Sequence, residues 1–172
     1  MPLAADGFHV QLLAPHHLRD RFHCRAESLN VFLRTSARKQ HENHTTRVHV
    51  LADRTGAIAG FFTLSACTLE LTGLPDAFRR GRPTFPVPAT LLGRFAVDER
   101  YEGQGLGRKL LSHAQREAHT ASATVASAFV VLDVALDASP EVTMLYERVG
   151  FTSLPSNPRR MILRMDDIAR SL

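Results

Sequence analysis

Apolar and polar residues follow two different spacings along this chain, and each spacing predicts one kind of element. In the first kind of segment, apolar residues alternate with polar ones or form a short continuous run, which is typical of β-strands. Asp53, Arg54, Thr55 and Gly56 lie between two such segments and favour a hairpin turn. The predicted strands are 8–14 (with Phe8, Val10 and Leu12 on one face), 46–53, 57–71, 89–97, 128–134 and 160–165.

In the second kind of segment, apolar residues recur every three or four positions, which is the spacing of one face of a helix. Helices are predicted over 26–40, from Leu106 to about Ala118, and from Pro140 to Gly150, with Ser139 as the N-cap of the last one. The inner face of the first helix consists of Leu29, Phe32, Leu33 and Ala37. Strands and helices in this order predict a mixed α/β (α+β) fold.

One long segment fits neither spacing. Residues 74–88 contain four prolines, which predicts a loop with one short helical turn around 76–80. The loop also carries Arg79, Arg80 and Arg82. Loops of this length inside a domain are usually functional or disordered.

Length and composition narrow the class of protein. A chain of 172 residues with 44% hydrophobic residues fits one domain, 1–172. Its apolar runs are too short to cross a bilayer and no signal peptide is evident, so we expect a cytoplasmic protein without membrane contact. Cys24 and Cys67 lack metal-ligand spacing and are expected to be reduced, packed thiols. The net charge of +4, nearly all from arginine, is compatible with an acidic partner or with a solvated surface.

Three glycines, Gly103, Gly105 and Gly107, stand between a buried strand and a long helix. The N-terminus of a helix has unpaired amides and a partial positive charge, so it attracts anions, and glycines let a diphosphate approach. A tight turn with close helix packing explains the same residues. The segment lacks the Lys-Ser/Thr ending of a P-loop, and it comes too late in the chain for a dinucleotide-binding motif.

Two separated motifs carry a family resemblance. "LLGRFAVDERYEGQGLGRKLL" and, about forty residues later, "MLYERVGF" together resemble the GCN5-related N-acetyltransferase (GNAT) family. The resemblance implies the acyl-CoA N-acyltransferase fold, a mixed and mostly antiparallel sheet flanked by helices, which binds acetyl-CoA. It implies that the backbone of Phe95, Ala96 and Val97 pairs with the pantetheine arm. It further implies that the pyrophosphate lies against Gly103, Gln104, Gly105, Leu106, Gly107 and Arg108.

Two residues depart from the family pattern. Glu102 stands where the family usually has Gln or Arg, which places an acid beside the expected diphosphate. Ser139 stands where many members have an Asn that contacts the coenzyme, and we expect the serine to lie at that contact. Arg100, Arg108 and Lys109 are nearby cations that can offset the acid.

Tyr146 is the candidate catalytic residue. A phenol with a pKa near 10 stays protonated at neutral pH and can give its proton to a departing thiolate. Spacing alone favours a core tyrosine, but the resemblance places the catalytic tyrosine of the family here. No general base or metal site stands out, because His16, His17, His41, His44 and His49 lack a strong ligand spacing. Direct attack by the acceptor amine is the simplest mechanism.

The N-terminal half resembles one subgroup of the family. "FHCRAESLNVFLRTSARKQ", "AGFFTLSACTLEL" and "PVPATLLGRFAVD" are similar to the acetyltransferase toxins encoded with ribbon-helix-helix antitoxins, which acetylate the α-amine of aminoacyl-tRNA. The resemblance implies a tRNA substrate, an antitoxin partner and a homodimer. The basic surface that tRNA needs is expected at Arg79, Arg80, Arg82, Arg159 and Arg160, which a solvated rim explains equally well.

Two alternatives to the toxin function remain at this point. One is an acetyltransferase for a small amine, an antibiotic or a protein N-terminus, with the same coenzyme site. The other is a module that binds acetyl-CoA but has little catalytic activity, which Glu102 and Ser139 permit and Tyr146 argues against.

Overall fold

A computed structural model describes residues 7–172 of the chain. Its centre is a seven-stranded sheet with the order β1-β2-β3-β4-β5-β7-β6. Every neighbouring pair is antiparallel except β4 and β5, which are parallel. The strands are β1 (His9–Leu12), β2 (Arg47–Ala52), β3 (Ile58–Leu69), β4 (Val87–Val97), β5 (Phe129–Asp133), β6 (Thr152–Leu154) and β7 (Asn157–Arg164).

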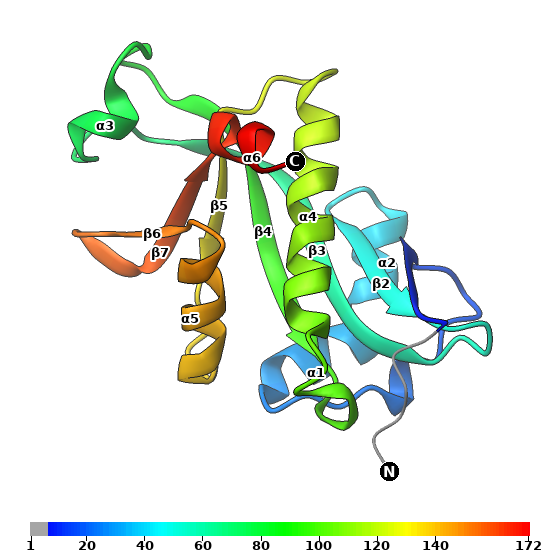
Figure 1. Ribbon diagram of the computed structural model, residues 1–172. Helices are drawn as coiled ribbons and strands as arrows, with labels where there is room; N and C mark the ends of the chain where they lie inside the picture. The colour runs from blue at the N-terminus through cyan, green and yellow to red at the C-terminus, as the bar shows by residue number, and fades with distance from the viewer. Residues whose placement is uncertain (1–6) are drawn as a thin grey trace.

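Helices cover both faces of this sheet (Figure 1). Phe62 and Phe95 pack with α4 on one face, whereas Phe61 and Ala96 pack with α1 on the other, because successive strand residues point to opposite sides. The helices are α1 (Glu27–Thr35), α2 (Ala37–Glu42), α3 (Asp76–Arg79), α4 (Leu106–Ser122), α5 (Pro140–Arg148) and α6 (Met165–Ser171), with 3₁₀ turns η1 (Arg19–Arg21) and η2 (Glu99–Tyr101).

The sheet opens between its two parallel strands. β4 pairs with β5 only from Ala89 to Leu92, and Gly93 is the extra residue of a bulge opposite β3. Beyond this point β4 continues to Val97 with β3 on one side and, among residues 7–172, no strand on the other. The two halves of the sheet diverge toward the end where α1 and α5 lie (Figure 1). One edge of β4, residues 93–97, is therefore free to pair with something else.

The mixed fold and most of its elements are confirmed, and the differences have local causes. The single predicted helix over 26–40 is two helices separated at Ser36, where the Thr35 hydroxyl donates to the Val31 carbonyl and competes with the helix ladder. Leu12 is 52% exposed, so the predicted inner face of the first strand is wrong at its end. The last strand begins before residue 160 and gives way to α6 at Met165. No helix within residues 7–172 is long and apolar enough to cross a membrane.

Candidate active site

A cavity of about 780 Å³ occupies the opening between β4 and β5. Its walls are the free end of β4, the glycine loop (residues 102–107), the first residues of α4, the inner face of α5 and the segment before α1. Cavities of this size hold drug-sized ligands, and they commonly form where a sheet divides.

The glycine loop presents a row of unpaired amides to this cavity. No backbone N–H from Gly103 to Arg108 donates to an acceptor within residues 7–172, and the first bond of the helix is Lys109 N–H to the Gly105 carbonyl. These amides lie at the N-terminus of α4, whose partial charge is positive. A phosphate-bearing ligand would satisfy these amides, so the loop fits the diphosphate of acetyl-CoA. Gln104 is the one predicted coenzyme residue of the loop whose side chain does not line the cavity; its Nε2 is buried without a partner within residues 7–172.

The three glycines of the loop have two different causes. Gly103 and Gly105 both have φ of +76°, and a Cβ added at either would meet nothing within 4 Å. They are required by the left-handed backbone, and the space beside them is open to a ligand. A Cβ on Gly107 would lie 3.2 Å from Leu145 Cδ2, so this glycine lets α4 pack against α5. The glycines therefore serve a tight turn and close helix packing, and the same arrangement leaves space for an anion beside Gly103 and Gly105.

The edge of β4 gives the second feature of a coenzyme site. Phe95, Ala96 and Val97 line the cavity while their strand pairs with β3 on its other side. An extended amide-containing chain laid along this edge would continue the sheet by main-chain hydrogen bonds. The pantetheine arm is such a chain, and it carries no charge. The edge and the glycine loop lie end to end along one cavity, in the order in which acetyl-CoA needs them.

Tyr146 lies on α5 and lines the same cavity. Its ring is held edge-on by Phe95 and Phe151, at centroid distances of 5.8 and 5.9 Å. Its hydroxyl makes no hydrogen bond to any residue between 7 and 172. Burial raises the pKa of the phenol, because a phenolate would lose its hydration. The group therefore holds its proton at neutral pH and is fixed in orientation.

Two further residues from the sequence analysis also line the cavity. Arg108 is exposed at the start of α4, where its charge reinforces the helix N-terminus. Ser139 is at the N-cap position of α5, as predicted, but its side chain does not cap the helix. A serine side chain reaches less far than an asparagine side chain. A coenzyme must therefore lie nearer to the backbone of α5 for Ser139 to contact it.

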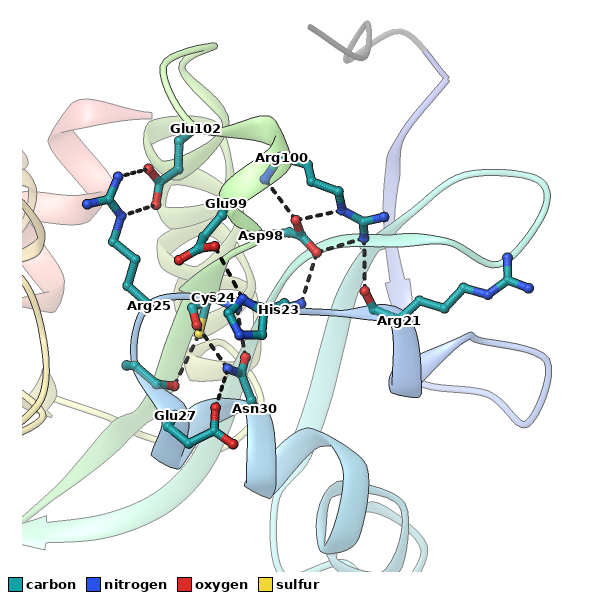
Figure 2. A network of polar contacts seen from close by, with 11 residues as sticks. Arg21, His23, Cys24, Arg25, Glu27, Asn30, Asp98, Glu99, Arg100 and Glu102 are labelled. Atoms are coloured by element: carbon teal, nitrogen blue, oxygen red, sulfur yellow. Dashed lines mark hydrogen bonds and ion pairs between the residues drawn. The ribbon is translucent and has the colours of Figure 1, made fainter.

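The acid that departs from the family pattern, Glu102, is paired in this structure. Arg25 Nε and Nη2 donate to its two carboxylate oxygens at 3.2 and 2.9 Å (Figure 2). Arg100 instead binds the buried Asp98 and the Arg21 carbonyl. The positive charge that compensates Glu102 therefore comes from Arg25, in the segment before α1, and the sequence did not indicate this residue.

The five arginines proposed for tRNA lie outside the cavity lining and in two places. Arg79, Arg80 and Arg82 are on or just after α3, whereas Arg159 and Arg160 are on β7. Arg79 pairs with Asp76, and Arg160 with Asp133. Arg82 donates to the Phe78 carbonyl and lies over the Phe129 ring, and Arg159 donates to the Val134 carbonyl. Arg80 alone forms no side-chain hydrogen bond or ion pair within residues 7–172.

Arg94 is a cavity residue that the sequence analysis did not select. Its guanidinium stacks over the Phe32 ring at 3.8 Å, and it has no hydrogen bond or carboxylate partner within the part of the chain that the structure describes. Burial lowers its pKa, although arginine keeps its charge. The signal was present in the sequence, since Arg94 interrupts the apolar run of a buried strand.

The remaining histidine and cysteine candidates show no catalytic arrangement within residues 7–172. His49 is buried against Phe62, and burial lowers its pKa to about 4, so it is neutral. Cys24 lines the cavity, but burial raises the pKa of its thiol to about 11, which disfavours the thiolate. Both Cys24 and Cys67 are free thiols. Within residues 7–172, no group of three His, Cys, Asp or Glu side chains is placed to hold a metal ion.

Comparison with known proteins agrees with this geometry. Residues 44–153 match the acetyltransferase (GNAT) domain family. A probable toxin TacT of Sinorhizobium fredii is 32% identical over 170 residues, covering 95% of this chain and 93% of that protein. A tRNA-acetylating toxin of Mycobacterium tuberculosis is 32% identical over 145 residues, covering 84% of each.

Two solved structures are similar over nearly their whole length. AtaT complexed with acetyl-methionyl-tRNA superposes with a TM-score of 0.86 at 26% identity, covering 95% of this chain and 98% of that one. A mutant of the toxin AtaT bound to the C-terminus of the antitoxin AtaR and acetyl-CoA gives a TM-score of 0.81 at 25% identity, covering 97% and 99%. With its divided sheet, its row of free amides and its cavity tyrosine, the chain belongs to the GNAT acetyltransferase family.

Proposed function

We propose that this protein transfers the acetyl group of acetyl-CoA to the α-amine of an aminoacyl-tRNA, in the manner of a toxin that blocks translation. The amides from Gly103 to Arg108 hold the diphosphate, and the edge of β4 from Phe95 to Val97 holds the pantetheine arm. The observation that carries the transferase activity is the position of Tyr146, which lies in the same cavity as both features with a free hydroxyl.

The transfer is one displacement. The neutral amine nitrogen bonds to the thioester carbonyl carbon, the C–S bond breaks, and its electron pair goes to sulfur. Tyr146 gives its proton to the sulfur, and the phenol regains a proton from solvent. The amine passes its surplus proton to water; two of the carboxylates that line the cavity, Glu102 and Asp133, are each paired with an arginine. The raised pKa of Tyr146 suits a proton donor that must not ionise beforehand.

The choice of acceptor rests on similarity and on charge. A relative is a tRNA-acetylating toxin, and a structural neighbour is complexed with acetyl-methionyl-tRNA. Arg94 lines the cavity and has no ion pair with any residue between 7 and 172, which disfavours a protonated small amine and favours an acceptor that carries phosphate. We place the reaction in the cytoplasm, where charged tRNA is found, and expect a homodimer and an antitoxin of the ribbon-helix-helix class.

Acetylation of purified charged tRNA tests this function. Wild-type protein should transfer radiolabelled acetyl from acetyl-CoA to aminoacyl-tRNA and not to the same tRNA after deacylation. Tyr146→Phe should lower turnover by about 10²- to 10⁴-fold, the usual contribution of a general acid, while acetyl-CoA affinity changes little. Transfer to a free amine or antibiotic without any transfer to charged tRNA would contradict the proposed acceptor. Normal turnover by the Phe variant would contradict the role of the tyrosine.

A further inference from the structure

An ion pair in the lining of the cavity lies immediately before the first free amide of the glycine loop. Glu102 precedes Gly103 in sequence, and Arg25 reaches it from the segment before α1, so the pair joins two walls of the cavity (Figure 2). Both side chains line the cavity, with 68% of Arg25 and 38% of Glu102 exposed. Exposed ion pairs add little to stability, so a gain in stability is a weak reason for this arrangement.

We propose that Arg25 is a coenzyme-binding residue: it neutralises Glu102 and donates to the diphosphate of acetyl-CoA, as a second cation beside Arg108 of the cavity lining. The inference rests on the proposed coenzyme site. It assigns the phosphate contact to a residue 77 positions away from the loop acid in sequence.

The guanidinium has donors to spare for this contact. An arginine has five N–H groups in a planar fork. Arg25 uses Nε and Nη2 for Glu102, and its Nη1 makes no hydrogen bond to any residue between 7 and 172. The bidentate contact fixes the plane of the fork beside the glycine loop. Glu102, to which Arg25 is bound, directly precedes Gly103, so we expect a phosphate resting on the loop amides to lie within reach of the remaining donors.

The backbone that carries Arg25 is held by buried polar contacts, which Figure 2 shows. Asn30, 1% exposed, accepts from the Cys24 N–H at 2.7 Å and donates to the Cys24 carbonyl at 2.9 Å. Asp98, fully buried, accepts from the His23 N–H at 3.0 Å. The residues just before Arg25 are thus fixed to the end of β4 and to α1. A cation on such a support loses little conformational freedom when a ligand binds.

The other charges around Arg25 are acidic. The hydrogen bond and charge of Glu102, together with the charges of Glu99 and Glu141, raise the pKa of Arg25. The Glu99 carboxylate contacts the His23 ring, with 3.2 Å between Oε2 and Nδ1. Glu141 lies at the start of α5 and lines the cavity. Without Arg25, two acids would face the entering diphosphate. The arginine therefore both removes a repulsion and adds a donor.

A double-mutant cycle on acetyl-CoA affinity, measured by titration calorimetry without any acceptor, tests the inference. Arg25→Ala should weaken binding about tenfold or more, because a charge-assisted contact is lost and Glu102 is left unpaired. Glu102→Gln alone should change affinity less than about twofold, since its charge is already neutralised. The double variant should bind better than Arg25→Ala but about threefold more weakly than wild type. Thermal unfolding should be nearly unchanged in all three, since both groups are at the surface.

The outcomes separate this inference from the proposed function. If wild-type protein fails to bind acetyl-CoA, the coenzyme site itself is wrong. If wild type binds and Arg25→Ala binds equally well, Arg25 is only a surface residue and the inference falls. If the double variant binds acetyl-CoA as tightly as wild type, Arg25 only neutralises Glu102 and makes no contact with phosphate. That result would overturn the role of Arg25 as a donor. Titration with 3′-dephospho-acetyl-CoA identifies the phosphate: the effect of Arg25→Ala should persist, and its disappearance would assign the contact to the 3′-phosphate and refute the diphosphate.

Discussion

At the scale of single residues, Arg94 shows how a locally unfavourable side chain indicates a binding role. A half-buried guanidinium costs free energy when no carboxylate or hydrogen bond compensates its lost hydration. Stacking on Phe32 recovers part of that cost. Arg94 lies on the α1 face of β4, at the bulge beside Gly93 where the two strands part. It therefore lies away from the glycine loop, and we propose that it contacts the acceptor rather than the coenzyme.

Replacing Arg94 by Met should therefore separate stability from substrate use. Met keeps the apolar stem over Phe32 and removes the unpaired charge, so the Tm should stay level or rise. The KM for charged tRNA should increase about tenfold, while the Kd for acetyl-CoA stays within about twofold. Arg116→Met, an exposed arginine on α4 away from the cavity, is the matched control. A loss of acetyl-CoA affinity in Arg94→Met would move the residue to the coenzyme half of the site.

At the scale of elements, the turn from β4 into α4 carries most of the residues that we propose for coenzyme binding. Gly105→Glu introduces three changes at once: a left-handed residue other than glycine, a side chain in open cavity space, and a negative charge beside free amides. We expect acetyl-CoA affinity to fall at least about tenfold. The measurement is calorimetric titration of acetyl-CoA with the purified variant.

Gly73 provides a control that matches the strain of Gly105. It has φ of +82°, a Cβ there would also meet nothing within 4 Å, and it does not line the cavity. Gly73→Glu should lower the Tm by a similar amount, because its backbone strain is similar, without changing acetyl-CoA affinity. Equal losses of affinity in both variants would show that the glycine loop acts through stability alone.

The sequence predicted the helices and strands better than it predicted the contacts between residues that lie far apart in the chain. Apolar spacing identified α4 and the long strands, because helix and strand periods follow directly from burial of one face. The pair of Arg25 and Glu102 was missed because two exposed charges far apart in sequence leave no periodic signal. The availability of the β4 edge for a ligand was expected only from the family resemblance, since strand pairing depends on partners that a single segment does not specify.

At the scale of the whole molecule, the basic charge is spread over separate surfaces. β4 has 11 residues, about 35 Å of extended chain, with α3 before its first residue and the glycine loop after its last. The arginines around α3 therefore lie at the far end of the sheet from the coenzyme loop (Figure 1). A small amine would not extend that far, whereas a tRNA would. Replacing the arginines around α3 should therefore affect acetylation of tRNA but not acetylation of a small amine.

Arg80 is the residue that best tests this difference, because it forms no ion pair or side-chain hydrogen bond in the described part of the chain. Arg80→Ala should lower kcat/KM for charged tRNA about threefold and reduce the slope of log(kcat/KM) against log[salt] by about one unit if one phosphate contact is lost. Arg54→Ala, an exposed arginine in the β2–β3 turn, should change neither. Acetyl-CoA affinity and Tm should stay at wild-type values in both variants. If the salt slope of Arg80→Ala is unchanged, the region around α3 does not contact tRNA. The acceptor would then be bound by residues at the cavity alone.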